Sequence, residues 1–191
     1  MAEYYFDIET FTAGPKPDPT SDKVITIQYQ QLSGVDGGPI GDLKILTEWD
    51  LGSEKAVFDA FKPLFLTERP FDFIPIGVNL VGFDLLALIS GFNRHYGLGL
   101  GMGFLRDRPY IDLKSTLVMM NNGRFGGYAQ LLGKSLSGSN VKEWYLARNY
   151  AKITDYVKDE AAIFVSAYKA LKRQLPTLVI RGIATPASTS G

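Results

Sequence analysis

The stretch YYFDIET, residues 4–10, holds two carboxylates, Asp7 and Glu9, in a segment that otherwise has the composition of a buried strand. Alternate residues of a strand project to the same face, so the two acids lie side by side and Phe6 and Ile8 lie opposite. Burying two like charges is costly unless something compensates them. Hydration at a strand end, hydrogen-bond donors or a divalent cation, which prefers oxygen ligands, would each do so.

A further candidate acid, Asp84, lies in the stretch GVNLVGFDLLAL, residues 77–88. The pattern predicts a strand that ends near Asn79 and a helix that opens at Phe83 and Asp84. A carboxylate in the first helical turn is stabilised by free N–H groups and by the helix dipole, which explains Asp84 without any chemistry. Asn79 is likewise typical of a turn.

Taken together, these two stretches resemble the first two motifs of the DEDD 3′–5′ exonuclease superfamily. Those motifs are Asp-x-Glu on an opening strand and Asn-x-x-x-Phe-Asp at a strand-to-helix junction. The similarity is greatest to the proofreading exonuclease domains of family B DNA polymerases and their stand-alone archaeal and bacterial relatives, and it covers most of residues 4–170. As parts of the second motif, Asn79 and Phe83 are expected to contact the nucleic acid. The matching residues are Asp7, Glu9, Asn79, Phe83 and Asp84.

The third motif of that superfamily, Tyr-x-x-x-Asp or His-x-x-x-x-Asp on a late helix, is irregular here. The only histidine, His95, comes too early for the second form. In the late segment TDYVKDEAAIFVSAY, Tyr156 is followed by Asp159 three residues on and by Glu160 four residues on. Residues four apart share a helix face, so Tyr156 and Glu160 could both reach a cleft. Glu160 and Asp159 are equal candidates for the fourth acid and Asp155 is a third. The alternative is that these acids are solvated and Tyr156 packs in the core.

The resemblance implies phosphodiester hydrolysis with two Mg²⁺ or Mn²⁺ ions. Two such ions about 3.5–4 Å apart bind both the attacking and the leaving oxygen, and they need several carboxylates. By this resemblance Asp7 bridges both ions, and Glu9 and the late-helix acid hold the ion that activates water. Asp84 acts on the second ion, largely through its waters, and Tyr156 orients the attacking water.

Residues that could hold an unpaired strand lie near these motifs. Aromatic side chains stack on single bases at ~1–3 kcal/mol each, and Phe11, just after the acid strand, is a candidate. Packing in the core explains Phe11 equally well. Lys142, Arg148 and Lys152 in KEWYLARNYAK are candidate phosphate contacts, although a charged helical face is usually only solvated.

The expected function is a metal-dependent 3′–5′ exonuclease acting on single-stranded DNA. RNA stays open as a substrate, because nothing in the sequence reports on contacts to a 2′-OH. One rival is an inactive domain of the same fold that binds single-stranded DNA without cutting it. Another is a ribonuclease or structure-specific endonuclease on that fold. Assembly as a homo-oligomer is compatible with the sequence.

Composition limits the setting in which this chemistry would occur. The chain has 191 residues, of which 46% are hydrophobic and 21% are charged, and this suits one domain with a sizeable core. The absence of cysteine fits a cytoplasmic location, and no secretory leader or membrane span is expected. Because the formal net charge is zero, local patches or metal ions would have to hold a nucleic acid.

The elements that must position these residues follow from hydrophobic periodicity and turn signals. Strands are expected over 3–8, 23–32, 43–49, 73–79 and 110–113. Helices are expected over 53–66 with Ser53 as N-cap, over 83–96, from 113 to 120, and over 128–136, 140–150 and 152–174. The strand KVITIQYQQL, 23–32, alternates as if one face were wet, 34–42 is a turn, and the glycine-rich segment 97–103 is a loop.

This order predicts an α/β chain with a mixed five-stranded sheet flanked by helices, as in the ribonuclease-H-like fold. In that architecture the first strand is central, which would place Asp7 and Glu9 at a cleft in the middle of the sheet. We expect one exonuclease domain over 1–175, followed by an extension over 176–191 whose end, 184–191, is disordered.

Overall fold

The computed structural model describes residues 2–124, 132–133 and 138–174. Its strands are β1 (Glu3–Phe11), β2 (Lys23–Leu32), β3 (Pro39–Thr47), β4 (Ile74–Gly77) and β5 (Ile111–Asp112). Its α-helices are α1 (Glu48–Leu51), α2 (Glu54–Phe65), α3 (Asp84–Tyr96), α4 (Met102–Arg106), α5 (Lys114–Met120), α7 (Val141–Leu146) and α8 (Tyr150–Gln174). Short 3₁₀ turns are η1 (Pro70–Asp72) and η2 (Gly138–Asn140).

The five strands form one mixed sheet in the order β3-β2-β1-β4-β5. β1 pairs antiparallel with β2, and β2 pairs antiparallel with β3. On the other side of β1, the strands β4 and β5 run parallel to it. The predicted mixed five-stranded sheet with the first strand at its centre is therefore confirmed.

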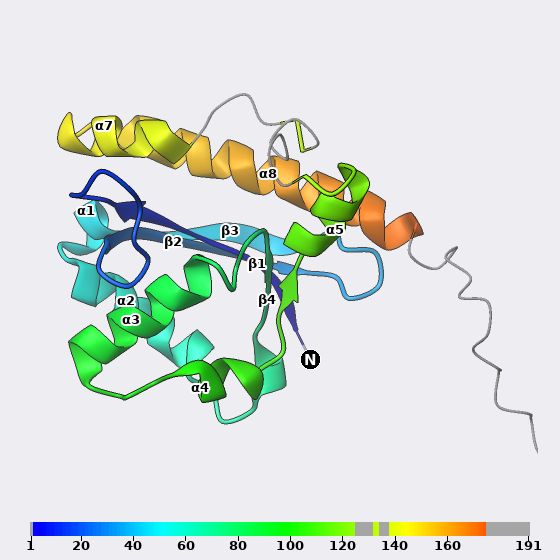
Figure 1. Cartoon of the computed structure of the whole chain (residues 1–191), viewed down its shortest axis with the longest axis horizontal. Coiled ribbons are helices and arrows are strands. Elements are labelled where there is room, and N and C mark those ends of the chain that lie inside the picture. Colours follow the sequence, from blue (N-terminus) through cyan, green and yellow to red (C-terminus); the bar gives the residue numbers. More distant parts are fainter. Residues whose placement is uncertain (1, 125–131, 134–137, 175–191) are drawn as a thin grey trace, which may run out of the picture.

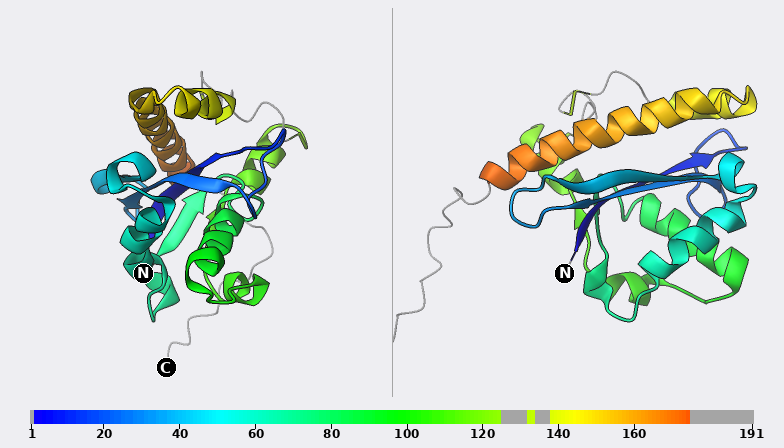
Figure 2. Two further views of the ribbon diagram at one scale, coloured as in Figure 1. Left: turned by 90° about the vertical axis from the view of Figure 1, so that its left-hand side faces the viewer. Right: turned by 180° about the vertical axis from the view of Figure 1, so that it is seen from behind.

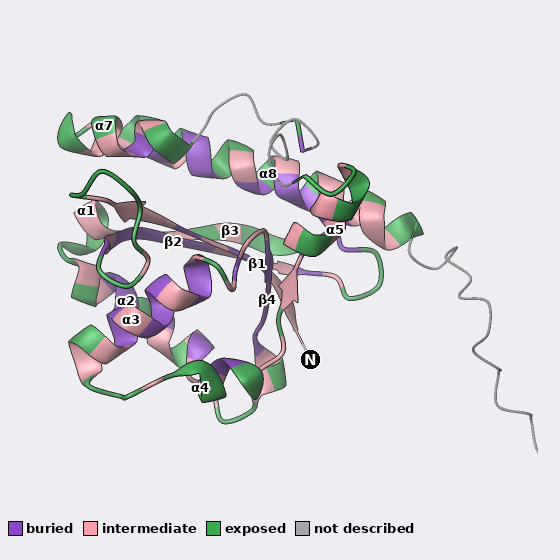
Figure 3. Ribbon diagram, viewed as in Figure 1, coloured by how far each residue is buried: buried purple, intermediate pink, exposed green. Residues whose placement is uncertain are grey.

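Helices cover both faces of this sheet (Figure 1). On one face, α2 and α3 pack against β1 and β2 in a core that includes Phe6, Ile8, Phe61 and Leu88. On the other face the long helix α8 runs along the sheet, and Figure 2 shows this layering from two further directions. Figure 3 shows that the buried parts of these elements face the space between helices and sheet.

The layer beneath α8 consists of two apolar clusters at the two ends of the helix. Towards the C-terminal end of α8, Tyr5 packs with Phe164 and Tyr168. Towards its N-terminal end, Ile153 and Val157 pack with residues of β2 and α7. The acid face of β1 lies between these two clusters, so β1 has an apolar layer on one side and a mixed polar layer on the other.

Local capping explains several element boundaries. The hydroxyl of Ser53 accepts a hydrogen bond from the N–H of Ala56 at 3.1 Å, which confirms the predicted N-cap of α2. The strand predicted over 43–49 instead spans Pro39–Thr47, and α1 follows it directly. Thr47 ends the strand because its side chain caps α1 by accepting from the N–H of Asp50 at 3.3 Å.

Other predicted boundaries also need correction. The helix predicted over 140–150 is interrupted, because α7 ends at Leu146, Arg148 has a φ of 55°, and α8 begins at Tyr150. The glycine-rich loop is shorter than expected, because α4 already begins at Met102. The helix predicted over 128–136 falls outside the described residues except for a turn at 132–133. The extension over 176–191 lies wholly outside them.

The prediction that β2 has one wet face is wrong. Thr26 and Gln28 are completely buried, because α8 covers this face of the sheet next to the acids of β1. The alternation of the β2 sequence correctly distinguishes the two faces of the strand, but helices cover both faces (Figure 1). No helix within residues 2–124, 132–133 and 138–174 combines the length and apolarity that a bilayer span requires.

Replacing Gly91 with alanine is expected to lower the free energy of unfolding by about 1–3 kcal/mol, the usual cost of overpacking. An added Cβ would lie 2.0 Å from Cζ of Phe58, whose side chain is completely buried between α2 and α3. This cost exceeds the gain of about 1 kcal/mol in helix propensity. Urea denaturation measures the difference.

Gly103→Ala is the matched control for this prediction. Gly103 also lies in a helix, α4, but apart from its own helix backbone and chain neighbours no atom of the described residues lies within 4 Å of its added Cβ. Its replacement should be neutral or slightly stabilising. Equal effects of the two substitutions would show that the close packing of α3 on Phe58 does not limit stability.

Candidate active site

Three carboxylates converge between β1 and α8. One side-chain oxygen each of Asp7, Glu9 and Glu160 lies within 4.8 Å of the others, and all three residues are half-buried. The first two project from the central strand, and the third comes from the helix that crosses above it. Such a set of hard oxygen donors from two rigid elements fits a divalent cation of the Mg²⁺ or Mn²⁺ type.

The orientation of α8 distinguishes between the late-helix acids. Glu160 lies one turn after Tyr156, which is buried against the sheet, and the two share a helix face. Asp159 and Asp155 are both exposed and do not belong to the acid cluster. Of the candidate acids in this segment, the structure therefore brings only Glu160 to Asp7 and Glu9.

Tyr156 itself lies at the edge of the acid cluster. Its ring packs edge-on against Trp144 of α7 at 6.0 Å between centroids. A Cβ placed on Gly138 of η2 would lie 3.5 Å from the Tyr156 hydroxyl and 3.9 Å from Oε2 of Glu9. The hydroxyl and the Glu9 carboxylate therefore lie close to the same backbone segment, and η2 forms one wall of the site.

Asp84 lies beside this cluster in a more buried position. It is only 3% exposed, and its Oδ1 accepts a hydrogen bond from the backbone N–H of Ile8 at 3.0 Å. Burial raises the pKa of Asp84 well above its usual value, and the nearby charge of Asp7 raises it further, against the lowering effect of the Ile8 N–H. The carboxyl group of Asp84, which is close to Asp7, is therefore harder to ionise than an exposed carboxyl group.

Two polar residues of β2 support the acids but were not predicted as site residues. In the strand register Gln28 is opposite Asp7 and Thr26 is opposite Glu9. Nε2 of Gln28 donates to Oδ2 of Asp7 at 2.8 Å, and the Thr26 hydroxyl donates to Oε1 of Gln28 at 2.8 Å. The alternate polar residues of the strand are the available signal, but the same alternation also predicts a solvent-exposed face.

A third unpredicted residue, Asp112, holds the loop that precedes Asp84. Its Oδ1 accepts from the N–H of Asn79 at 2.8 Å, and its Oδ2 accepts from the N–H of Val81 at 3.2 Å. Asn79 has a φ of 65°, and its side-chain oxygen accepts from Nζ of Lys114 at 2.8 Å. Asn79 thus has a structural function in this loop. Its contact with nucleic acid stays a prediction, as does that of the half-buried Phe83.

The other predicted nucleic-acid contacts lie around α7 and the start of α8. The Phe11 ring is partly buried and packs against Tyr145 at 5.0 Å between centroids, which agrees with the core-packing alternative. Nζ of Lys142 donates to the carbonyl of Gly14 at 3.1 Å and so attaches α7 to the loop after β1. Arg148 and Lys152 are exposed.

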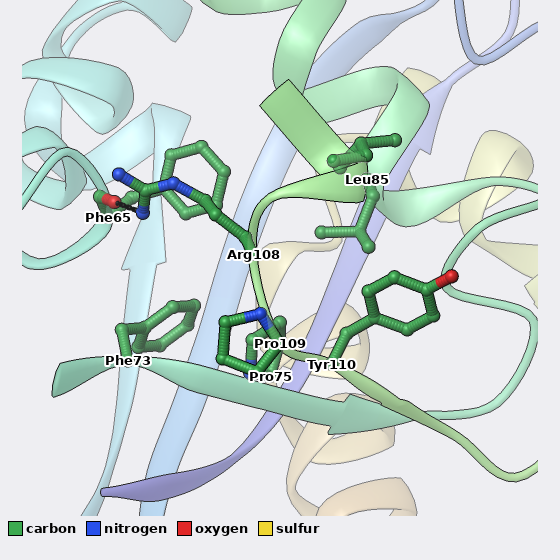
Figure 4. A pocket seen from close by; sticks show the side chains of 8 residues that line it. Phe65, Phe73, Pro75, Leu85, Arg108, Pro109 and Tyr110 are labelled. Atoms are coloured by element: carbon green, nitrogen blue, oxygen red, sulfur yellow. Dashed lines mark hydrogen bonds between the residues drawn. The ribbon is translucent and has the colours of Figure 1, made fainter. Parts of the chain in front are cut away.

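A small pocket elsewhere does not belong to this site. Phe65, Phe73 and Leu85 line it, and they belong to the core on the α2 and α3 side of the sheet, opposite the acids. Arg108 lies over this pocket in Figure 4 and donates to the carbonyl groups of Phe65 and Thr67. The guanidinium therefore satisfies backbone groups at the end of α2.

Comparison with known proteins supports the fold. The arrangement of strands and helices in this chain is similar to that in E. coli exonuclease I. The zinc-bound complex of that protein with single-stranded DNA superposes with a TM-score of 0.60 at 15% identity, covering 92% of this chain and 41% of that one. Its complex with a 5cy-dT13 oligonucleotide gives 0.46 at 16% identity, covering 66% of this chain and 30% of that one.

The superposition with a TM-score of 0.60, together with the strand order, confirms the predicted ribonuclease-H-like fold. The chain spans less than half of the exonuclease I chain, and at such low identity the similarity concerns the fold alone. No protein-family model matches the sequence, and no curated protein sequence matches it significantly. The predicted relationship to the family B polymerase domains stays a prediction.

Asp84→Asn is expected to make the metal-free protein more stable than wild type at pH 7–8. A raised folded-state pKa means that the folded chain binds this proton more tightly than the unfolded chain. The resulting stabilisation is complete below the unfolded pKa and is lost as the pH rises through the folded pKa. Asparagine does not ionise and can still accept from the N–H of Ile8.

Urea denaturation in EDTA at pH 4 and at pH 8 measures this effect. The difference between Asp84→Asn and wild type should be small at pH 4 and clear at pH 8. Asp155→Asn, which changes an exposed acid of α8, is the control and should leave the free energy of unfolding at pH 8 within about 0.5 kcal/mol of wild type. A variant less stable than wild type at pH 8 would contradict the electrostatic interpretation of this buried carboxyl group.

Proposed function

We propose that the chain is a divalent-metal-dependent 3′–5′ exonuclease that hydrolyses single-stranded DNA. The observation that supports this most strongly is the acid cluster, in which one carboxylate oxygen each of Asp7, Glu9 and Glu160 lies within 4.8 Å of the others. Of the acids that follow Tyr156, the one in the cluster has the four-residue spacing of the exonuclease motif. The similarity in fold to exonuclease I adds weight to this interpretation.

In the proposed mechanism, the acids, Gln28 and Tyr156 have separate roles. Asp7, Glu9 and Glu160 would hold a divalent metal ion, and Asp84 lies on the Asp7 side of the cluster as a further acidic group. When bound, divalent ions would supply an activated water and charge stabilisation for the leaving oxygen. Gln28 fixes the rotamer of Asp7 by donating to its Oδ2. Tyr156, whose hydroxyl lies near the Glu9 carboxylate, orients the attacking water.

Single-stranded DNA is the proposed substrate for two reasons. The exonuclease I structures of similar fold include complexes with single-stranded DNA. The N-terminal part of α8 also offers a suitable approach, because Lys152, Tyr156 and Glu160 follow one another at four-residue intervals along one side of the helix. Lys152 lies ~12 Å along the helix axis from Glu160, within reach of a phosphate upstream of the cleaved bond.

The decisive assay uses single strands labelled at the 5′ or the 3′ end, with Mg²⁺, with Mn²⁺ and with EDTA. Stepwise shortening of the 5′-labelled strand from its 3′ end, abolished by EDTA, is expected. Internal fragments would instead indicate an endonuclease, and binding without products would indicate an inactive DNA-binding domain. RNA of the same sequence tests whether the 2′-OH is tolerated.

Glu160→Ala is expected to reduce the rate at least a hundredfold, equivalent to about 2.7 kcal/mol of barrier. The substitution removes the only acid that α8 contributes to the cluster of described residues. Asp159→Ala is the matched control, because this acid is adjacent in sequence but exposed, and its rate should stay within about threefold of wild type, or about 0.7 kcal/mol. Circular dichroism verifies that both variants are folded.

If Asp159→Ala were the more damaging substitution, α8 would have to be rotated from the position described above. If neither variant lost more than about tenfold, or about 1.4 kcal/mol, the late helix would not be part of the catalytic site. Higher wild-type activity in Mn²⁺ than in Mg²⁺ is also expected. A glutamate in place of aspartate shifts its oxygens by one methylene, and Mg²⁺ demands the stricter geometry.

Lys152→Ala is expected to weaken binding of single-stranded DNA and to lower the slope of log K against log salt by roughly 0.7, the value for one lost phosphate contact. Lys158→Ala is the control on the same helix. It removes a positive charge that is also exposed, but one that lies six residues further on and faces a different direction. Fluorescence anisotropy with a labelled oligothymidylate in Ca²⁺ measures both variants. Equal slopes would exclude a direct phosphate contact at Lys152.

A further inference from the structure

Tyr5 carries a hydroxyl group that is buried in the interior of the molecule. The side chain lies on β1, is 2% exposed, and packs its ring against Phe164 of α8 at 5.0 Å between centroids. Among the described residues, its hydroxyl oxygen has no hydrogen-bond partner although it is fully buried. A buried donor without an acceptor costs free energy, and phenylalanine would fill the same space without that cost.

Tyr5 lies next to the acid cluster on β1. Strand alternation places Tyr5 on the same face of β1 as Asp7 and Glu9. Its ring contacts α8 one turn beyond Glu160, so the side chain lies under the same helix that supplies the third acid. Residues two apart on a strand are ~6.6 Å apart along it, so Tyr5 is the direct neighbour of Asp7 on this face.

We propose that the Tyr5 hydroxyl donates a hydrogen bond to an oxygen atom held at the acid cluster, either a metal-held water or a phosphate oxygen of the substrate. The inference rests on the proposed function, since it requires a cation at these carboxylates. The hydroxyl is a proton donor among acceptors, and a small oxygen ligand at the cluster would supply the acceptor that it lacks. Tyr5 is then a binding residue at the floor of the site, in addition to the four acids and Tyr156.

The test compares Tyr5→Phe with Tyr168→Phe in the full chain. Tyr168 is an equally buried tyrosine in the same apolar cluster, but its hydroxyl donates to Oε2 of Glu3 at 2.9 Å, away from the acids. Isothermal titration measures the dissociation constant for Mn²⁺ alone, and then for thymidine monophosphate at saturating Mn²⁺. Urea denaturation in EDTA measures the stability of each metal-free variant.

Tyr5→Phe should leave the metal-free protein as stable as wild type or more stable, because it removes an unsatisfied donor. It should also raise one of the two dissociation constants about fivefold or more. An effect on Mn²⁺ alone identifies a metal-held water as the acceptor, and an effect only on thymidine monophosphate identifies a phosphate oxygen. Tyr168→Phe should destabilise the protein with and without metal and change neither constant.

Unchanged dissociation constants for both ligands in Tyr5→Phe would overturn this inference while leaving the proposed function intact. So would a loss of stability in EDTA as large as that of Tyr168→Phe, because the hydroxyl would then have a purely structural function. A wild-type chain that binds no Mn²⁺ would overturn the proposed function and this inference together. The wild-type titration therefore separates the two failures.

Discussion

The structure depends on the constraint that a central strand carries two adjacent acids on one of its faces. β1 pairs with β2 along its length and with β4 at its beginning, so it can neither rotate nor slide without breaking the sheet. Because Phe6 and Ile8 must face the apolar core under α2 and α3, Asp7 and Glu9 must face the other layer. Three sources bring further groups to this layer: β2 brings Gln28, the start of α3 brings Asp84, and α8 brings Glu160.

Each of these sources makes a specific hydrogen bond to β1. Gln28 comes from the paired strand and donates directly to Asp7. Pairing between β1 and β4 stops at Tyr5 and Ile76, so further along β1 the N–H of Ile8 needs another acceptor. Asp84 supplies it from the start of α3, which joins the second acid motif to the first through the backbone. Asp112 in turn holds the loop before Asp84 through backbone N–H groups.

The placement of α8 agrees with its attachment to the beginning of β1. Glu3, the first residue of the strand, accepts from the Tyr168 hydroxyl and from Nζ of Lys172, each at 2.9 Å. Glu9 lies ~20 Å further along the strand, and Glu160 lies ~12–18 Å back along the helix from Tyr168 and Lys172. These lengths nearly match, so the attachment at Glu3 brings Glu160 over the acid pair when α8 runs antiparallel to β1.

The sequence alone determined the features that arise from local backbone geometry and from element order. Alternation along YYFDIET was enough to place Asp7 and Glu9 side by side, and the succession of strands and helices was enough to predict a mixed sheet with β1 at its centre. It also identified the strand-to-helix junction at Asp84. These inferences held because strand period, turn signals and helix starts are properties of short segments.

The tertiary structure decided which faces are covered. Asp159 and Glu160 differ by about 100° around α8, and only the docking of that helix on the sheet makes Glu160 the inward acid. The alternation of β2 likewise separated Thr26 and Gln28 from the apolar residues, but it could not show that α8 buries them beside the acids. The same docking leaves the Tyr5 hydroxyl buried among the described residues without a partner. Periodicity defines the faces of an element, whereas contacts between residues far apart in the chain determine what each face meets.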